Sequence, residues 1–428
     1  MIAMSILILL IVLLVIGSPI GVSMLITGTL GLYWIGGWEG MMAVLSTSPR
    51  ESGSVYEFLT IPMFLLMAEF VLRSGVADDL FETAAAWFGR VRGGLGIATA
   101  ISGAGFGAIC GSSTAAAATL SSTSLPAMLK QGYKLDMAAG VVAISGTLSM
   151  LIPPSVAMVL YALLADVSIA KMLVAGIIPG ALVAFTIALT VYVLAWHNPE
   201  CAPLGVKVSW AEKFRSLRLV GPMLILLMSV TGVIYGGVAT PTEASALGAF
   251  VAGILYFKRG RRTLPEVYSV LARATRSACM IGLILIGAHV FTTFFALTQT
   301  TQAIVAWVGG LNVSVWVLIL SLVVTYIILG CFMDQFAILV LTIPVLSPLL
   351  HSLGVDLVWF GIIVIVTAEL GMVMPPLGLN AFVVSKYTKI PVSEVFRGIW
   401  PHVIAHLIAI GLLLGFPVLT MWLPSIMK

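Results

Sequence analysis

The chain has 428 residues, of which 60% are hydrophobic and only 9% are charged, with a formal net charge of +4. Because soluble domains carry roughly 25% charged residues, this composition excludes a soluble protein. Apolar runs of about 20 residues recur from end to end, which indicates an all-α polytopic membrane protein and not a barrel of short alternating strands. The first run has no basic residues before it and no small-residue cleavage pattern, so we interpret it as a retained helix.

Residues 1–74 are predicted to form apolar membrane helices, and an arm helix is predicted to follow over 75–92. The segment SGVADDLFETAAAWFGRV (74–91) mixes acidic and apolar residues at helical spacing. This pattern is typical of a helix that lies along the membrane interface.

A polar tract interrupts the next apolar stretch, residues 93–129, where Gly111, Ser112, Ser113 and Thr114 follow GAIC. Basic residues flank the stretch on both sides, at positions 90, 92, 130 and 134, and Lys and Arg collect in cytoplasmic loops. Both ends are therefore predicted to be cytoplasmic, which indicates a re-entrant helical hairpin with Ser112–Ser113 at its tip. The alternative is two ordinary helices packed closely through Gly and Ala.

A second interruption, SGTLSMLIPPS (145–155), lies within the predicted helix 136–165. Proline has no N–H, so Pro153 and Pro154 should leave the carbonyls of Ser149 and Met150 without helical partners. Free carbonyls beside hydroxyl groups suit a hard cation such as Na⁺, and helix N-termini suit an anion. The alternative is a kinked helix whose carbonyls are satisfied by a neighbouring helix.

The second half of the chain repeats the first at a fixed offset of 222 residues, which places Pro153–Pro154 on Pro375–Pro376 and Ser112 on Asp334. It follows a basic linker, 198–218, predicted to be cytoplasmic. The expected elements are membrane helices over 219–296, an arm helix over 297–310, a hairpin over 311–350 and a broken helix over 357–386.

No Lys or Arg occurs between Arg276 and Lys386, so the ends of the second hairpin are predicted to lie outside the cytoplasm. Equivalent segments then face opposite sides of the membrane, which defines an inverted repeat. Both chain termini are predicted to be extracytoplasmic.

Three polar residues of the second half are candidates for function. Asp334 and Glu369 are lone carboxylates at membrane depth, where an ionisable group indicates a functional role. The second Pro–Pro pair should free the carbonyls of Gly371 and Met372, and Asn380 follows it closely enough to line the same site.

Four other ionisable residues in apolar surroundings are given structural interpretations. Glu69 and Glu243 are interpreted as structural. His402 and His406 are four residues apart, yet no third ligand is near them in sequence, so no metal site is expected.

The motifs GSSTAAAATL, SGTLSMLIPPS, TPTEA (240–244), GCFMD and ELGMVMPPLGLN together resemble the large membrane subunit of the tripartite ATP-independent periplasmic (TRAP) transporters, over essentially the whole chain. The resemblance implies a multi-pass protein of the bacterial inner membrane with periplasmic termini, and not an enzyme. It implies import of a small organic acid coupled to two or more Na⁺ ions by an elevator motion. The implied partners are a small four-helix membrane subunit and a periplasmic substrate-binding protein.

The resemblance also implies site residues. The first Na⁺ site would use Ser112, Ser113, Gly146, Leu148, Ser149 and Ile152. The second would use Gly330, Asp334, Glu369, Gly371 and Met374. Substrate would contact Ser112, Ser113, Thr114, Pro154, Asp334 and Asn380. Two departures from the family pattern are Met374 in place of Thr and Ser149 in place of Gly, so the second site could use backbone oxygens alone.

The expected architecture is an inverted-repeat elevator-type transporter with two re-entrant hairpins and two Pro–Pro-broken helices. Its transport domain would comprise 93–197 and 311–424, and its scaffold 1–74 and 219–296 with the small subunit. The nearest alternative is a stand-alone sodium/dicarboxylate-type anion symporter. An intramembrane serine hydrolase lacks a base, because the first half has no His before His197. A purely structural subunit would not need two broken-helix sites.

Overall fold

The computed structural model describes residues 2–205, 208–260, 263–310 and 314–427, and these form helices joined by short loops, with no strand among them. Within these described ranges, seven helices are long and apolar enough to cross a membrane, or nine if each of two bent pairs is counted as one span. The predicted class of all-helical, polytopic membrane protein is therefore confirmed.

The helices of the first half are α1 (Ile2–Val15), α2 (Ile20–Gly53), η1 (Tyr56–Leu59), α3 (Thr60–Leu72), α4 (Val76–Phe88), α5 (Gly94–Cys110), α6 (Ser113–Lys130), α7 (Leu135–Leu151), α8 (Val156–Ala165), α9 (Ile169–Ala175), α10 (Ile177–His197) and η2 (Pro199–Cys201). Those of the second half are α11 (Trp210–Leu227), η3 (Met228–Gly232), α12 (Val233–Tyr235), α13 (Pro241–Lys258), α14 (Leu264–Leu297), α15 (Thr300–Gly310), α16 (Val315–Phe332), α17 (Gln335–Ser352), α18 (Leu357–Gly371), α19 (Leu379–Thr388), α20 (Val392–Gly415) and α21 (Val418–Ile426).

Helix boundaries follow the duplication found in the sequence. Helices α6 and α17 differ by 222 residues at both ends, and α5 and α16 agree with this offset to within one residue. Helix α2 bends at Gly37, whose φ of 62° is not helical, and its two parts correspond to α13 and to the start of α14. The duplication therefore extends from landmark prolines to the helices themselves.

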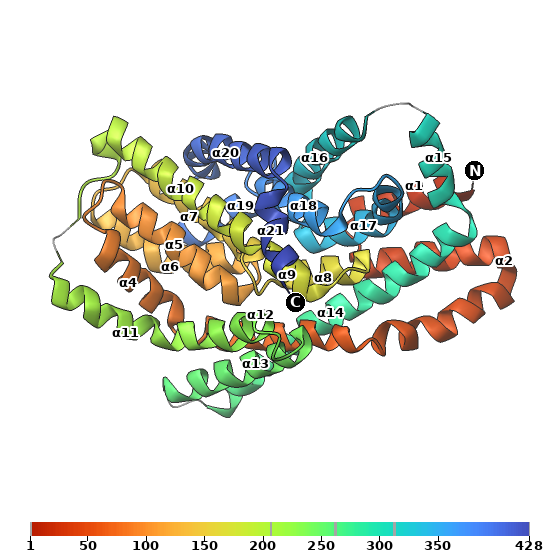
Figure 1. The fold of residues 1–428 in the computed structure, drawn as a ribbon, viewed down its shortest axis with the longest axis horizontal. Coiled ribbons are helices and arrows are strands. Elements are labelled where there is room, and N and C mark those ends of the chain that lie inside the picture. The colour runs from red at the N-terminus through yellow and green to blue at the C-terminus, as the bar shows by residue number, and fades with distance from the viewer. Residues whose placement is uncertain (1, 206–207, 261–262, 311–313, 428) are drawn as a thin grey trace.

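The two longest helices, α2 and α14, lie on the same side of the molecule as α11 and α13. Figure 1 shows α2, α11, α13 and α14 along one edge, with the α5–α6 pair and the α16–α17 pair above its two ends. Helix α2 packs against α14, and α3 packs against α13. The α2–α14 contact is close because glycine faces the partner backbone: a Cβ added at Gly28 would lie 2.9 Å from the amide nitrogen of Phe291.

The two halves interlock in the remaining bundle. Helix α8 of the first half packs against α17, and α19 of the second half packs against α6. Helix α7 packs along α20, where Gly140 meets the backbone of Gly398 so closely that neither position has room for a Cβ. The first hairpin thus packs against α19, the helix that follows the second Pro–Pro break. The second hairpin packs against α8, the helix that follows the first break.

The predicted linker, 198–218, is shorter in the structure, because α11 already begins at Trp210. The Ser209 hydroxyl accepts from the amide of Glu212, and the Glu212 carboxylate accepts from the amide of Ser209, a capping box that starts the helix within the linker. Linker residues 206–207 and the first residues of the second predicted hairpin, 311–313, lie outside the described residues.

Candidate ion and substrate site

The first hairpin turns at two residues with separate backbone roles. Gly111 ends α5 in the left-handed conformation, with φ 60°, which glycine adopts without strain. Ser112 begins α6, and its hydroxyl accepts from the amide of Ala115 at 3.4 Å and lies 3.3 Å from the Thr114 hydroxyl. Helix capping therefore explains the side chain of Ser112, while Ser112 and Thr114 both remain partly exposed.

Ser113 is fully buried and faces both halves of the chain. A Cβ added at Gly146, on α7, would lie 3.0 Å from the carbonyl oxygen of Ser113. The Ser113 hydroxyl donates to Oδ1 of Asn380, on α19, at 3.4 Å. The structure thus brings together three of the predicted site residues, although the sequence assigns Asn380 to substrate alone.

The first Pro–Pro break partly departs from the expectation. The carbonyl of Met150 is not free, because the Ser155 hydroxyl donates to it at 2.6 Å. Ser155 also begins α8 by accepting from the amide of Met158. The Ser149 carbonyl has no helical partner, because the residue four positions later is Pro153, which has no N–H. The expectation of a free carbonyl is therefore wrong for Met150, which is satisfied by a hydroxyl that the sequence motifs did not single out.

The other residues of the predicted first Na⁺ site lie in the last turns of α7. The Ser149 hydroxyl donates to the Gly146 carbonyl at 2.7 Å, and the Ile152 amide donates to the Leu148 carbonyl at 3.0 Å. The Leu148 carbonyl oxygen keeps a second lone pair for a cation. Pro154 is buried beside them.

At the second break, both expected free carbonyls have partners. The amide of Met374 donates to Gly371 at 2.9 Å, and the amide of Asn380 donates to Met372 at 3.1 Å. Gly378 makes this return possible with a φ of 53°. The expectation of unpartnered carbonyls is therefore wrong here, because the chain folds back to supply two amides that a sequence pattern does not show.

The predicted members of the second Na⁺ site differ in their surroundings. Asp334 is exposed and caps α17, where its Oδ1 accepts from the amide of Ala337 at 3.0 Å. Gly330 packs on Gly371, since a Cβ added at Gly371 would lie 2.6 Å from the Gly330 Cα. Glu369 is 1% exposed, and neither of its oxygens has a hydrogen-bond partner.

Gln335, which is not among the predicted site residues, is fully buried, and its two side-chain amide atoms have no hydrogen-bond partner. The signal for it was present in the duplication, because the 222-residue offset places Ser113 on Gln335.

The two glutamates interpreted as structural both make contacts within the protein. Glu69 pairs with Arg273 at 3.0 Å, and Glu243 accepts from the amide of Thr240 at the start of α13 at 2.8 Å. His402 and His406 are buried without hydrogen-bond partners, and in the described part of the chain no three His, Cys, Asp or Glu residues are grouped as metal ligands.

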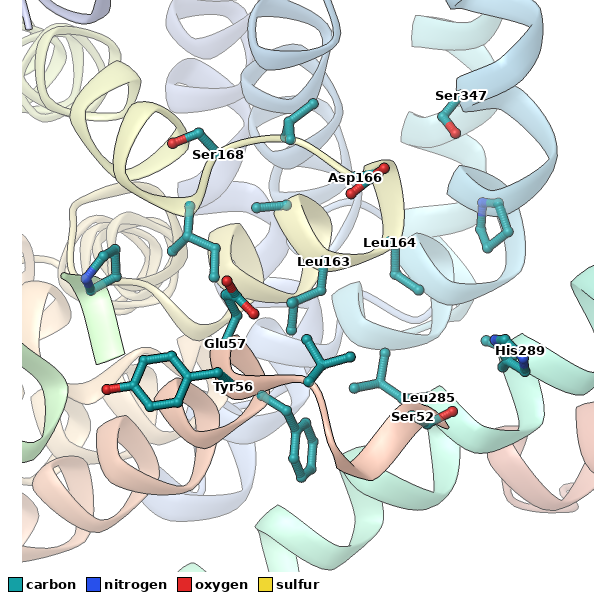
Figure 2. A pocket seen from close by; sticks show the side chains of 18 of the residues that line it. Ser52, Tyr56, Glu57, Leu163, Leu164, Asp166, Ser168, Leu285, His289 and Ser347 are labelled. Carbon is teal, nitrogen blue, oxygen red and sulfur yellow. The ribbon is translucent and has the colours of Figure 1, made fainter. Parts of the chain in front are cut away.

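A cavity of about 720 Å³ lies apart from the hairpin tips. It opens between η1, α14 and the start of α13 on one side, and the α8–α9 loop and α17 on the other (Figure 2). Glu57 and Asp166 stand on opposite walls, and His289, which pairs with Glu51 at 3.1 Å, lies at one end. No predicted site residue lines this cavity. Asp166 follows the ten-residue α8, so it lies about 15 Å beyond the first break.

The chain is similar over most of its length to known proteins. Residues 7–419 match the family model described as "Tripartite ATP-independent periplasmic transporter, DctM component". The chain is 33% identical to the C4-dicarboxylate TRAP transporter large permease protein DctM of Pseudomonas aeruginosa over 400 residues, covering 91% of this chain and 93% of that protein. It is 28% identical to the ectoine TRAP transporter large permease protein TeaC of Halomonas elongata, covering 96% of each. It is also 28% identical to the sialic acid TRAP transporter large permease protein SiaM of Vibrio cholerae, covering 87% of each.

Two solved structures share the fold. The YdaH transporter of Alcanivorax borkumensis superposes with a TM-score of 0.62 at 17% identity, covering 90% of each chain. MtrF of Neisseria gonorrhoeae superposes with a TM-score of 0.62 at 14% identity, covering 98% of this chain and 94% of that one.

Proposed function

Since this chain belongs to the family of large permease (DctM) components of TRAP transporters, we propose that it imports a small organic acid together with Na⁺ by an elevator motion. Members of this family are transporter permeases and not enzymes. Relatives are named for C4-dicarboxylates, ectoine and sialic acid, so the proposed substrate is a small molecule that carries a carboxylate.

The observation that carries the proposal is the position of Ser113. Its carbonyl faces Gly146 of the first broken helix, and its hydroxyl bonds Asn380 of the second. A cation held by the first Na⁺ site would order the hairpin tip, and the ordered tip presents the N-terminus of α6 to an anion. Ion binding and substrate binding then depend on the same few residues.

Charge gives the coupling a physical basis. Neither hairpin contains Lys or Arg, and none occurs between Arg276 and Lys386. A bound carboxylate therefore has no cationic side chain from these segments, and moving it through hydrocarbon uncompensated is costly. Co-bound Na⁺ offsets that charge. The second Na⁺ is proposed to bind near Gly330, Asp334, Glu369, Gly371 and Met374, mainly through backbone oxygens.

In the proposed motion, residues 93–197 and 311–424 move as the transport domain against a scaffold of 1–74 and 219–296. The 720 Å³ cavity lies at the boundary of these two parts, with η1, α13 and α14 on the scaffold side and the α8–α9 loop on the transport-domain side. This position supports movement of the transport domain along the scaffold at that boundary. The arrangement in the inner membrane is proposed to be inverted between halves, with both termini periplasmic. A small four-helix membrane subunit is proposed to complete the scaffold, and a periplasmic binding protein is proposed to deliver substrate.

The test is uptake of a radiolabelled organic acid into proteoliposomes that contain this chain with its small subunit. An inward Na⁺ gradient, a proton gradient or neither is imposed, and the binding protein is added or withheld. We expect uptake to require Na⁺ and the binding protein, and Ser112→Ala/Ser113→Ala to abolish it. Uptake without the binding protein would favour the stand-alone symporter, and Na⁺-dependent uptake that survives the double substitution would refute the role of the first hairpin tip.

A further inference from the structure

The Glu369 carboxylate is buried without a partner. It lies in α18, of which residues 358–371 are buried throughout, and it is itself 1% exposed. Neither oxygen has a hydrogen-bond partner, and none of the ion pairs in the described part of the chain includes it. A buried charge with no partner is strongly destabilising, so this position requires a ligand or a proton to be stable.

A chain of two polar side chains from other elements begins beside the carboxylate. The Ser113 hydroxyl of α6 lies beside it without forming a regular hydrogen bond to it. That hydroxyl is 3.4 Å from Oδ1 of Asn380, which is fully buried on α19 and whose Nδ2 has no partner. A carboxylate, a hydroxyl and an amide oxygen form the donor set of a hard cation.

The protein supplies no cation of its own here. No Lys or Arg occurs between Arg276 and Lys386, and the first hairpin contains none. The buried histidines of α20, His402 and His406, make no hydrogen bond to Glu369. The compensating charge must therefore come from solution.

We propose that Glu369, Ser113 and Asn380 form a third cation site, which holds one Na⁺ between the two halves of the chain. The inference rests on the proposed Na⁺ coupling and removes Glu369 from the second Na⁺ site, because Asp334 caps α17 in an exposed position and makes no hydrogen bond to Glu369. An ion at this site ties the tip of the first hairpin to the second broken helix. Binding of this one ion then orders the hairpin tip of the first half and the broken helix of the second half together, since the ion contacts both.

The site is tested by equilibrium binding of radiolabelled Na⁺ to the purified complex of this chain with its small subunit. Glu369→Gln keeps the shape and removes the charge, Asn380→Ala removes one oxygen, and Glu82→Gln on the exposed face of α4 is the charge-matched control. Folding of each variant is checked by its elution on gel filtration. We expect Glu369→Gln to bind about one Na⁺ fewer per complex than the wild type and the control.

Asn380→Ala should keep the number of bound ions but weaken one of them at least about tenfold. This second variant decides the question if Glu369→Gln does not fold. Wild-type stoichiometry and affinity in both variants would overturn the third site and assign Glu369 to a proton. If the wild-type complex binds no Na⁺ at all, the proposed Na⁺ coupling fails as well, so the two failures are distinguishable.

Discussion

Gly146 offers a direct test of the first ion site. It lies on α7 where the first hairpin approaches most closely, and a Cβ added there would be 2.9 Å from the Cβ of Ala117 and 3.0 Å from the carbonyl oxygen of Ser113. Neither atom is the end of a flexible side chain. In Gly146→Ala, the hairpin tip must therefore move away from α7 and carry a predicted Na⁺ ligand with it.

The size of the effect follows from a matched substitution. Gly411 lies on the exposed face of α20 and has no atom within 4 Å of the point where a Cβ would lie. Gly411→Ala therefore gains the same helix propensity as Gly146→Ala, roughly 1 kcal/mol, without a clash. Overpacking costs about 1–3 kcal/mol. If this strain falls on the Na⁺-bound state, the apparent Na⁺ affinity should weaken roughly fivefold to 150-fold relative to Gly411→Ala.

The measurement is the Na⁺ concentration for half-maximal uptake in proteoliposomes, with Na⁺-dependent thermal stabilisation of the purified complex as a second readout. Both should shift in Gly146→Ala and stay at wild-type values in Gly411→Ala. Half-saturation values that agree within about twofold between the two variants would refute the reasoning, because the clash would then have no bearing on ion binding.

Three further predictions concern the break, the topology and the arm. Ser155→Ala should lower the thermal midpoint, because it removes a helix cap and the donor to Met150, worth about 1–2 kcal/mol together; an unchanged midpoint would contradict this. In a background without other cysteines, Glu200→Cys should react with an impermeant maleimide only after the inner membrane is opened, and labelling of intact spheroplasts would reverse the predicted topology. Asp79→Arg and Arg259→Asp should each reduce thermal stability. The double variant should be more stable than the sum of the two losses by about 1 kcal/mol or less, because the ion pair is partly exposed. Strictly additive losses would show that this pair contributes nothing to stability.

Local chemistry made the breaks in the helices predictable. A proline pair cannot continue a helix wherever the rest of the chain lies, and a serine or aspartate that follows an apolar run caps the next helix. The turn at Ser112, the turn at Asp334 and the breaks at Pro153 and Pro375 all follow from such short-range rules. The duplication added the correspondence between halves, because both copies contain the same breaking residues.

Only the tertiary structure decided which of these elements meet. Helices such as α7 and α18 are buried on all sides, so their apolar sequences carry no periodic signal of the face that packs against a partner. Ser113 and Asn380 are 267 residues apart, and their contact depends on the seating of α19 against α6. For the same reason the burial of Glu369 beside the Ser113 hydroxyl depends on packing between distant segments.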